Sequence, residues 1–208
     1  MSKSLGNSPD PLELIDKYGA DGLRFGLMRI APSGQDIRFD ERQIEEGRNF
    51  ATKLWNVARF RQMHGASEAT PRIDIQSLSI YAVEVLARLN ETIDAIESEY
   101  REYHFNMIAQ HLYNFVWSDY CDWFVEAAKT DIFSGDEVKK KSALVVMDVV
   151  LSATLRLLHP FMTCGRYAAI GLRYPKNSRF LMRCATSGGT ICSHRLSPDC
   201  NFASTSGG

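Results

Sequence analysis

Lys3 is the residue in this chain that is best placed to act on a polyphosphate. It lies between Ser2 and Ser4, and Gly6 follows in the same hydroxyl-rich loop. A lysine on a mobile loop can move onto phosphate groups and supply positive charge where negative charge develops during a reaction. Composition alone does not separate this interpretation from an ordinary loose terminus. We take Lys3 as the catalytic candidate of the chain.

Two short helices are predicted to position this loop, over residues 11–18 and 20–30. Asp10 is a suitable N-cap for the first helix, Pro11 suits its first turn, and Gly19 suits its end. Its predicted apolar face holds Leu12, Ile15 and Tyr18. The second helix has apolar residues at Leu23, Phe25, Leu27 and Met28.

A long amphipathic helix is predicted next, up to about residue 63. Asp40 is its expected N-cap, and Phe39 and Ile44 can pack across the cap as a hydrophobic staple. Residues recur behind the cap at steps of three and four, which is the period of one helix face. The predicted buried stripe comprises Ile44, Gly47, Phe50, Ala51, Leu54, Val57, Ala58 and Arg61.

Three more helices complete the predicted body. The first covers residues 79–100, with a buried stripe of Ala82, Val85, Leu86, Leu89, Ile93, Ile96 and Tyr100. The second covers residues 105–129, and we interpret its aromatic run from Trp117 to Phe124 as core. The third begins at a Ser134–Glu137 capping box, has Val138 among its apolar positions and ends at Pro160. No strand-like period of comparable length precedes residue 160, so the fold class is all-α, an up-and-down helical bundle.

Basic residues form an edge on the helix that follows Asp40. We predict that this edge contacts the phosphates of a folded RNA, because lysine and arginine supply most sequence-independent affinity for nucleic acid. Trp55 beside Asn56 could stack on and hydrogen-bond an unstacked base, although tryptophan there is more often core. The competing interpretation of the edge is a solvated helix face. The basic residues are Arg42, Arg48, Lys53, Arg59 and Arg61, and the RNA-binding candidates are Arg42, Arg48, Asn49, Lys53, Trp55, Asn56 and Arg59.

The overall composition is that of an ordinary soluble protein. Apolar residues make up 45% and charged residues 24% of the chain, and the formal net charge is −1. Any basic surface must therefore be local. No apolar run approaches the roughly 20 residues that span a bilayer, and no signal-peptide pattern opens the chain. We expect a cytoplasmic, monomeric protein without a membrane partner.

The composition changes abruptly after residue 162. Residues 163–208 contain four of the five cysteines, six basic residues and the single acid Asp199. They show no sustained period, so we expect an irregular or disordered tail. A metal site built from Cys184, Cys192, His194 and Cys200 does not fit zinc spacing, in which paired ligands lie two to four residues apart. We therefore predict no metal site.

The opening run Met1-Ser2-Lys3-Ser4-Leu5-Gly6-Asn7 resembles the Lys-Met-Ser-Lys-Ser signature loop of class I aminoacyl-tRNA synthetases, without its first lysine. Later blocks are similar to the valyl-tRNA synthetase family. They are Asp16-Lys17-Tyr18-Gly19-Ala20-Asp21-Gly22, Gly34-Gln35-Asp36-Ile37-Arg38-Phe39, Lys53-Leu54-Trp55-Asn56-Val57-Ala58-Arg59-Phe60, Cys121-Asp122-Trp123-Phe124 and Leu158-His159-Pro160-Phe161-Met162. The resemblance covers about residues 1–162, and the related isoleucyl enzyme shares its opening part.

The resemblance implies a reaction, a set of ligands and a domain plan. Valine and ATP would give valyl-adenylate, and the valyl group would then pass to tRNA(Val), with Mg²⁺ accompanying ATP in the full-length enzyme. Ser2, Lys3 and Ser4 would bind the ATP phosphates. Residues 1–39 would be the signature loop and a connector from the catalytic domain. Residues 40–162 would be the helical anticodon-binding domain, and residues 163–208 an aberrant tail.

The departures from the family lead to a further expectation. The family's nucleotide-binding fold and editing domain would lie upstream of Met1, so we expect a C-terminal fragment that is inactive and binds no cofactor alone. A shifted reading frame would account for residues 163–208. The alternatives are a stand-alone helical RNA-binding or scaffold module without catalysis, and a fragment of the isoleucyl enzyme.

Overall fold

The computed structural model describes residues 9–31, 39–65 and 78–162 of the chain. Within these ranges the secondary structure is entirely helical, which confirms the predicted fold class. The helices are α1 (Pro11–Tyr18), α2 (Ala20–Ile30), α3 (Glu41–Met63), α4 (Ile80–Arg101), α5 (Phe105–Asn114), the π-helix η3 (Phe115–Phe124), α6 (Val125–Ile132) and α7 (Glu137–Leu158).

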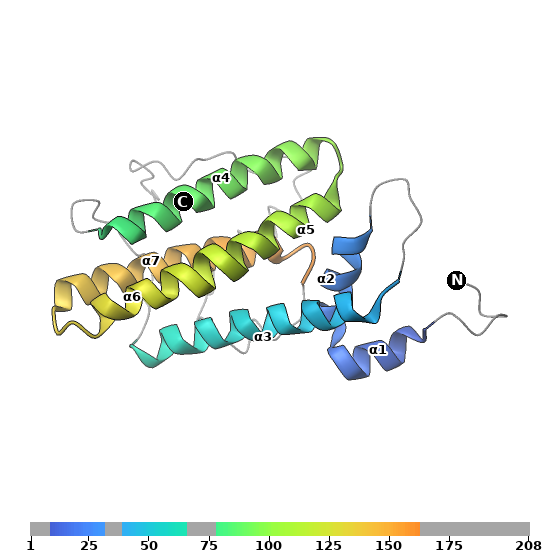
Figure 1. Ribbon diagram of the computed structural model, residues 1–208, viewed down its shortest axis with the longest axis horizontal. Coiled ribbons are helices and arrows are strands. Elements are labelled where there is room, and N and C mark those ends of the chain that lie inside the picture. The colour runs from blue at the N-terminus through green and yellow to red at the C-terminus, as the bar shows by residue number, and fades with distance from the viewer. Residues whose placement is uncertain (1–8, 32–38, 66–77, 163–208) are drawn as a thin grey trace, which may run out of the picture.

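The long helices lie side by side and alternate in direction along the chain (Figure 1). α3, α4 and α7 are three of the rods, and α5, η3 and α6 follow one another to form the fourth. The short helices α1 and α2 pack at one end of this bundle, beside the start of α3. The predicted up-and-down bundle is therefore confirmed. None of the helices that the structure describes is both long and apolar enough to cross a membrane.

The prediction for α3 is confirmed in its bounds, its cap and its buried face. The Asp40 carboxylate accepts a hydrogen bond from the backbone N–H of Arg42, and the helix ends at Met63. Phe39 packs against the small apolar cluster that contains Ile44, as a hydrophobic staple would. Every predicted stripe residue is buried except Ala51, which is half-buried: Ile44, Gly47, Phe50, Leu54, Val57, Ala58 and Arg61.

Three glycines let the backbones of α2 and α3 approach each other closely. A Cβ at Gly26 would lie 2.6 Å from the Gln43 carbonyl oxygen, well inside van der Waals contact. A Cβ at Gly47 would clash with the carbonyl oxygen of Gly22. Because interiors are close-packed, backbone atoms at these points have no room to move aside. The connector helix α2 is thereby held against α3 along its length.

A second attachment joins α2 to the last turn of the bundle. The Arg24 guanidinium donates hydrogen bonds to the carbonyl oxygens of Pro160 and Phe161, each at 3.2 Å. These carbonyls lie just beyond α7, where the helix leaves its last acceptors without internal partners. Phe25 also stacks on Phe50 of α3, with 4.6 Å between the ring centroids. The connector therefore contacts both the first long helix of the bundle and the turn that follows the last one.

Helix α1 differs from its prediction on one face. Asp10 caps α1 and Gly19 ends it, as predicted. Leu12, however, is 69% exposed, and Leu14 is buried in its place with Tyr18. The helix is only eight residues long, so the sequence offers two overlapping apolar stripes, and packing against Leu23 and Ile44 selects the one with Leu14. The same kind of correction applies to Tyr100, which is 38% exposed at the end of α4.

The predicted helix over residues 105–129 is interrupted by a π-helical stretch and continues to Ile132. In a π-helix the backbone bonds from residue i to i+5, so each turn contains an additional residue. Buried residues accordingly recur at a step of five, from Phe115 to Tyr120 and from Val116 to Cys121. This step rotates Trp123 off the buried side, and 47% of Trp123 is exposed. The prediction that the whole aromatic run is core is wrong for Trp123.

The cap of α7 is Asp136 and not Ser134. The Asp136 carboxylate accepts hydrogen bonds from the N–H groups of Val138 and Lys139. The Ser134 hydroxyl instead closes the preceding turn, donating to the carbonyl of Asp131. A start two residues later than predicted also explains Val138, which is 66% exposed in the first turn.

Alanine at the three interface glycines should separate their roles. Gly47→Ala and Gly26→Ala should each lower the free energy of unfolding by about 1–3 kcal/mol, because the new methyl group meets backbone. At Gly22 the nearest atom would be the Arg48 amide nitrogen at 3.1 Å. There the helix propensity of alanine, worth roughly 1 kcal/mol over glycine, should offset most of the strain. Urea unfolding of the three variants measures this order, and a stabilised Gly47→Ala protein would contradict it.

Candidate nucleic-acid interface

Helix α3 presents the RNA-binding candidates on two strips of its outer surface. At about 100° per residue, Arg42, Asn49, Lys53 and Asn56 fall on one strip. Arg48, Trp55 and Arg59 fall on a neighbouring strip. The three arginines and two asparagines are exposed, whereas Lys53 and Trp55 are half-buried. The buried stripe of the helix lies opposite, so both strips face away from the main core.

Lys53 is the candidate that the structure holds most firmly. Its ammonium group forms an ion pair with Asp122 of η3 and lies 3.8 Å from the centroid of the Trp117 ring. Only 23% of the side chain is exposed. A cation fixed over a ring face is favourable electrostatically, and more so when it is partly desolvated. Lys53 therefore joins α3 to η3 through its pair with Asp122.

A ladder of aromatic rings continues from this contact towards the connector. Trp117 stacks on Tyr113 with 5.5 Å between centroids and 15° between the ring planes. Tyr113 in turn stacks on Phe50 at 5.5 Å. Burial raises the pKa of the Tyr113 hydroxyl, so this group stays neutral at physiological pH. We call Phe50, Tyr113 and Trp117 the ring ladder.

Arg29 lies against the middle ring of the ring ladder, and sequence reasoning missed it. Its guanidinium lies 3.9 Å from the centroid of the Tyr113 ring. It also pairs with Glu46 of α3 at 3.0 Å and donates two hydrogen bonds to the side-chain oxygen of Gln110 in α5. No local pattern in the sequence indicates this role, because its partners lie 17 and 81 residues away.

Internal pairing engages four of the eight charged side chains of α3. Glu41 pairs with Lys17 and Glu46 with Arg29, while Lys53 and Arg61 have acidic partners on η3 and α7. The Lys17 ammonium and the Tyr18 hydroxyl lower the pKa of the Glu41 carboxyl. Among the described residues, no ion pair is formed by the remaining charges of this helix, which are Arg42, Glu45, Arg48 and Arg59. Three free arginines against one free glutamate leave a local positive surface on a nearly neutral chain.

Arg61 does not belong to the basic edge. Its side chain is 5% exposed and pairs with the equally buried Asp148 of α7, with 2.6 Å between Nη2 and Oδ2. Its Nη1 donates to the carbonyl of Gly65. Arg61 occupies the buried stripe of α3, and its long side chain carries the charge across to α7. Its place in the predicted edge is therefore a wrong assignment, although its place in the stripe is right.

Cys121 does not form a nucleophilic centre, and neither do His104 and His111. Burial raises the pKa of the Cys121 thiol to about 12, so it is protonated at neutral pH. His104 and His111 lie near the Glu99 carboxylate, at 2.9 Å and 4.0 Å. Among the described residues, no group of three or more histidine, cysteine or acidic side chains could hold a metal ion. Ser2, Lys3, Ser4 and the cysteine-rich tail lie outside those residues.

Comparison with known proteins gives two family matches. The family described as "tRNA synthetases class I (I, L, M and V)" matches residues 1–40, and the "Anticodon-binding domain of tRNA ligase" matches residues 83–164. The valine–tRNA ligase of Oceanobacillus iheyensis is 46% identical over 163 residues, which are 78% of this chain and 18% of that protein. This chain belongs to the class I aminoacyl-tRNA synthetases.

Solved synthetase structures share the fold of the chain. Methionyl-tRNA synthetase of Mycobacterium tuberculosis, solved with methionyl-adenylate, has a TM-score of 0.64 over 83% of this chain and 38% of that one. The LeuRS of Agrobacterium radiobacter K84, solved in a ternary complex with tRNA and LeuAMS, has a TM-score of 0.60 over 82% of this chain and 20% of that one. Each is 20% identical to this synthetase chain. At this identity the likeness shows the helical architecture alone.

The role of Arg61 can be tested apart from RNA binding. Asp148→Ala leaves a buried guanidinium without its carboxylate and should lower the free energy of unfolding by about 3–5 kcal/mol. Replacing both partners, with Arg61→Met and Asp148→Leu, should restore stability to about the parent value. Asp94→Ala on the exposed side of α4 is the control. Urea unfolding would contradict this role if Asp148→Ala costs no more than Asp94→Ala.

Proposed function

We propose that this chain is the part of a valine–tRNA ligase that bears the signature loop and the anticodon-binding bundle. In the whole ligase, valine and ATP form valyl-adenylate, and the valyl group then passes to tRNA(Val). The observation that carries the proposal is the 46% identity to a valine–tRNA ligase over 163 residues. The chain spans only 18% of that relative, so the activity belongs to a larger enzyme.

We infer a domain plan that the family matches over residues 1–40 and 83–164 and the packing support. Residues 1–39 hold the signature loop and connector, residues 40–162 form the anticodon-binding domain, and residues 163–208 are an appended tail. The contacts of Arg24 and Arg29 support a connector that is fixed to the bundle. A fixed connector sets the position of the RNA-binding face relative to the loop that meets ATP. Such positioning matters because catalysis depends strongly on how the reacting groups are placed.

The signature loop would act on ATP. Lys3 matches the second lysine of the family's loop and would stabilise the charge that develops on the phosphates during adenylate formation. Ser2 and Ser4 would contact the same phosphates, and Mg²⁺ would accompany ATP.

The outer face of α3 would bind the RNA. Arg42, Arg48 and Arg59 have no acidic partner among the described residues and would contact phosphates. Asn49 and Asn56 lie exposed between them and could hydrogen-bond bases. Lys53 and Trp55 are half-buried and would contribute at the edge of the surface. This arrangement favours a phosphate-tracking contact with a few amide groups available for base recognition.

Salt dependence of tRNA binding tests the face of α3. Arg48→Ala with Arg59→Ala should weaken binding of tRNA(Val) and reduce the slope of log affinity against log salt by about 1–2, as expected for two lost phosphate contacts. The control removes two exposed charges from α7, with Lys139→Ala and Arg156→Ala, and should leave the slope unchanged. Filter binding over a range of potassium chloride concentrations measures both. Equal slopes for the two double variants would show that α3 faces solvent in the complex.

The chain alone should not activate valine. Less than a fifth of the matched relative is represented here, so the residues that would enclose valine and ATP are not supplied. Valine-dependent exchange of pyrophosphate into ATP should stay at the level of a reaction without protein. Exchange above that level, lost in Lys3→Ala, would contradict the proposed division of the activity.

A further inference from the structure

The turn between α4 and α5 presents three aromatic side chains that the fold leaves exposed. Tyr103 is 69% exposed, and Tyr100 and Phe105 are each nearly 40% exposed. Both tyrosine rings meet Phe105 edge to face, with centroids 6.2 Å apart in each case. We call these three residues the hairpin tip. Single exposed apolar residues are common on proteins, but three that are joined through contacts with one shared ring form a surface.

Tyr103 stands where the backbone favours glycine. Its φ is +60°, and it is the one non-glycine residue with a positive φ in the part of the chain that the structure describes. Its N–H bonds the carbonyl of Tyr100, and the N–H of His104 bonds the carbonyl of Glu99. These two bonds form the Schellman motif that ends α4, and its left-handed position is usually glycine. A tyrosine there is unfavourable for the turn, so its ring has another use.

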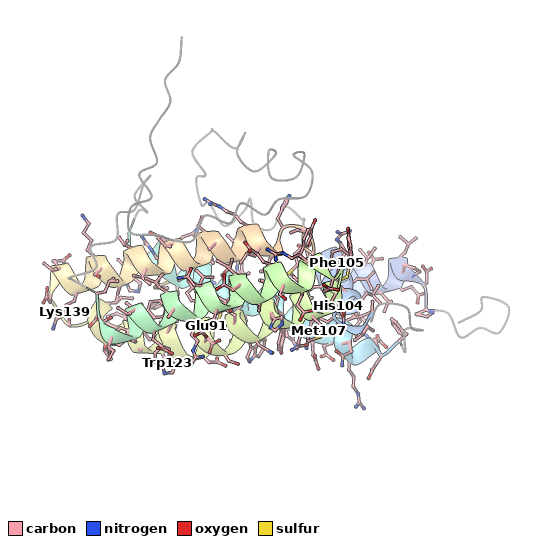
Figure 2. All side chains as sticks on the ribbon, turned by 90° about the horizontal axis from the view of Figure 1, so that it is seen from above. Glu91, His104, Phe105, Met107, Trp123 and Lys139 are labelled. Carbon is pink, nitrogen blue, oxygen red and sulfur yellow. The ribbon has the colours of Figure 1, made fainter. Side chains whose placement is uncertain are left out.

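The hairpin tip lies at the connector end of the bundle. Figure 2 shows His104 and Phe105 beside the blue connector helices, whereas Lys139 lies at the opposite end. The contacts agree, since Arg29 of α2 bonds Gln110, five residues beyond Phe105 on α5. Helices α1 and α2, which lie at this end, fall within residues 1–40, which the class I synthetase family matches. The tip therefore lies at the end of the bundle where this matched part of the chain packs.

We propose that the hairpin tip docks on the nucleotide-binding portion of the full-length synthetase. The inference rests on the proposed function, because it takes that portion as the chain's covalent neighbour. Aromatic residues are the usual anchors of such contacts, since they bury a large area with few rotatable bonds. The docked tip would hold the bundle at a fixed angle to the site of adenylate formation.

The size and charge of the tip favour this occupant over two others. Three rings fall far short of the roughly 800 Å² per partner that a stable dimer buries. A neighbour in the same polypeptide needs less area, because the covalent link keeps the two surfaces at a high effective concentration. RNA is disfavoured because Glu99 and Glu102 adjoin the tip and outnumber its one arginine, Arg101, so the turn would repel phosphates. A covalently joined protein surface is the occupant that meets both constraints.

A full-length chimera tests the docking. Residues 1–162 of this chain replace the matching segment in the Oceanobacillus iheyensis valine–tRNA ligase, and Tyr103→Ser with Phe105→Ser is introduced into it. Loss of docking should uncover Arg101, which adjoins the tip, so trypsin should cleave after Arg101 about tenfold faster under native conditions. The control is Ile80→Ser with Val83→Ser, two exposed apolar residues at the far end of α4. This control should be cleaved at the parent rate.

A second variant keeps the test sharp if the double substitution disturbs the turn. Tyr103→Gly removes the ring but suits the left-handed backbone, so the 208-residue chain should unfold at a urea concentration equal to or above that of the parent. In the chimera it should still accelerate cleavage. The 208-residue chain should therefore keep its stability while the chimera loses docking. A tyrosine with a purely structural role would not give this combination of results.

Three results would overturn the proposal. The tip variants could be cleaved at the parent rate, which would show that nothing docks there. Alternatively, the 208-residue chain could self-associate through the tip in sedimentation measurements, or the tip variants could lose tRNA affinity. Either result would assign the surface to another occupant. A parent chimera that fails to activate valine would count against the proposed function instead, and its cleavage would still report on docking.

Discussion

The rest of the structure depends on the backbone contact between α2 and α3. At Gly26 and Gly47 the two helices are so close that a methyl group would meet a carbonyl oxygen or Cα of the neighbouring helix. Contact of this kind cannot be replaced by adjustable side chains, so it sets the separation and the rotation of α2 on α3. Phe25 can stack on Phe50, and Arg29 can reach Glu46, only at that separation. The connector and the bundle consequently form one packed body rather than two bodies joined by a hinge.

This contact also determines how charge is distributed over the RNA-binding candidates. With α1 and α2 in place, Arg29 forms an ion pair with Glu46, and Lys17 forms an ion pair with Glu41. Asp122 of η3 forms an ion pair with Lys53. The pairing neutralises the acids of α3 more completely than its bases, and Arg42, Arg48 and Arg59 remain against Glu45. Net charge along the chain is close to zero, but packing against other helices produces a local positive surface.

Sequence reasoning succeeded where the physics is local and failed where it is not. The cap, length and buried stripe of α3 follow from Asp40 and from apolar residues at helical steps, and the structure confirms them. Arg29 was missed because its partners come from α3 and α5, which no sequence window contains together. The π-helical stretch could have been recognised in the sequence, because the aromatic residues Phe115 and Tyr120 are five residues apart. Asp136 displaced Ser134 as the cap because both precede the helix, and only the turn geometry separates them.

Arg61 and Lys53 show why a basic residue on a helix is weak evidence for RNA contact. The two residues are eight positions apart on α3, which places them about 80° apart around the helix axis. That rotation puts Arg61 in the buried stripe with Asp148 and leaves Lys53 at the edge over Trp117. An arginine opposite a buried carboxylate is held by their mutual attraction in a site with little water, and it cannot turn outwards without breaking that pair. A basic side chain can contact a phosphate only if it is exposed and has no acidic partner within the fold. Among the described residues of α3, these are the arginines on its two outer strips.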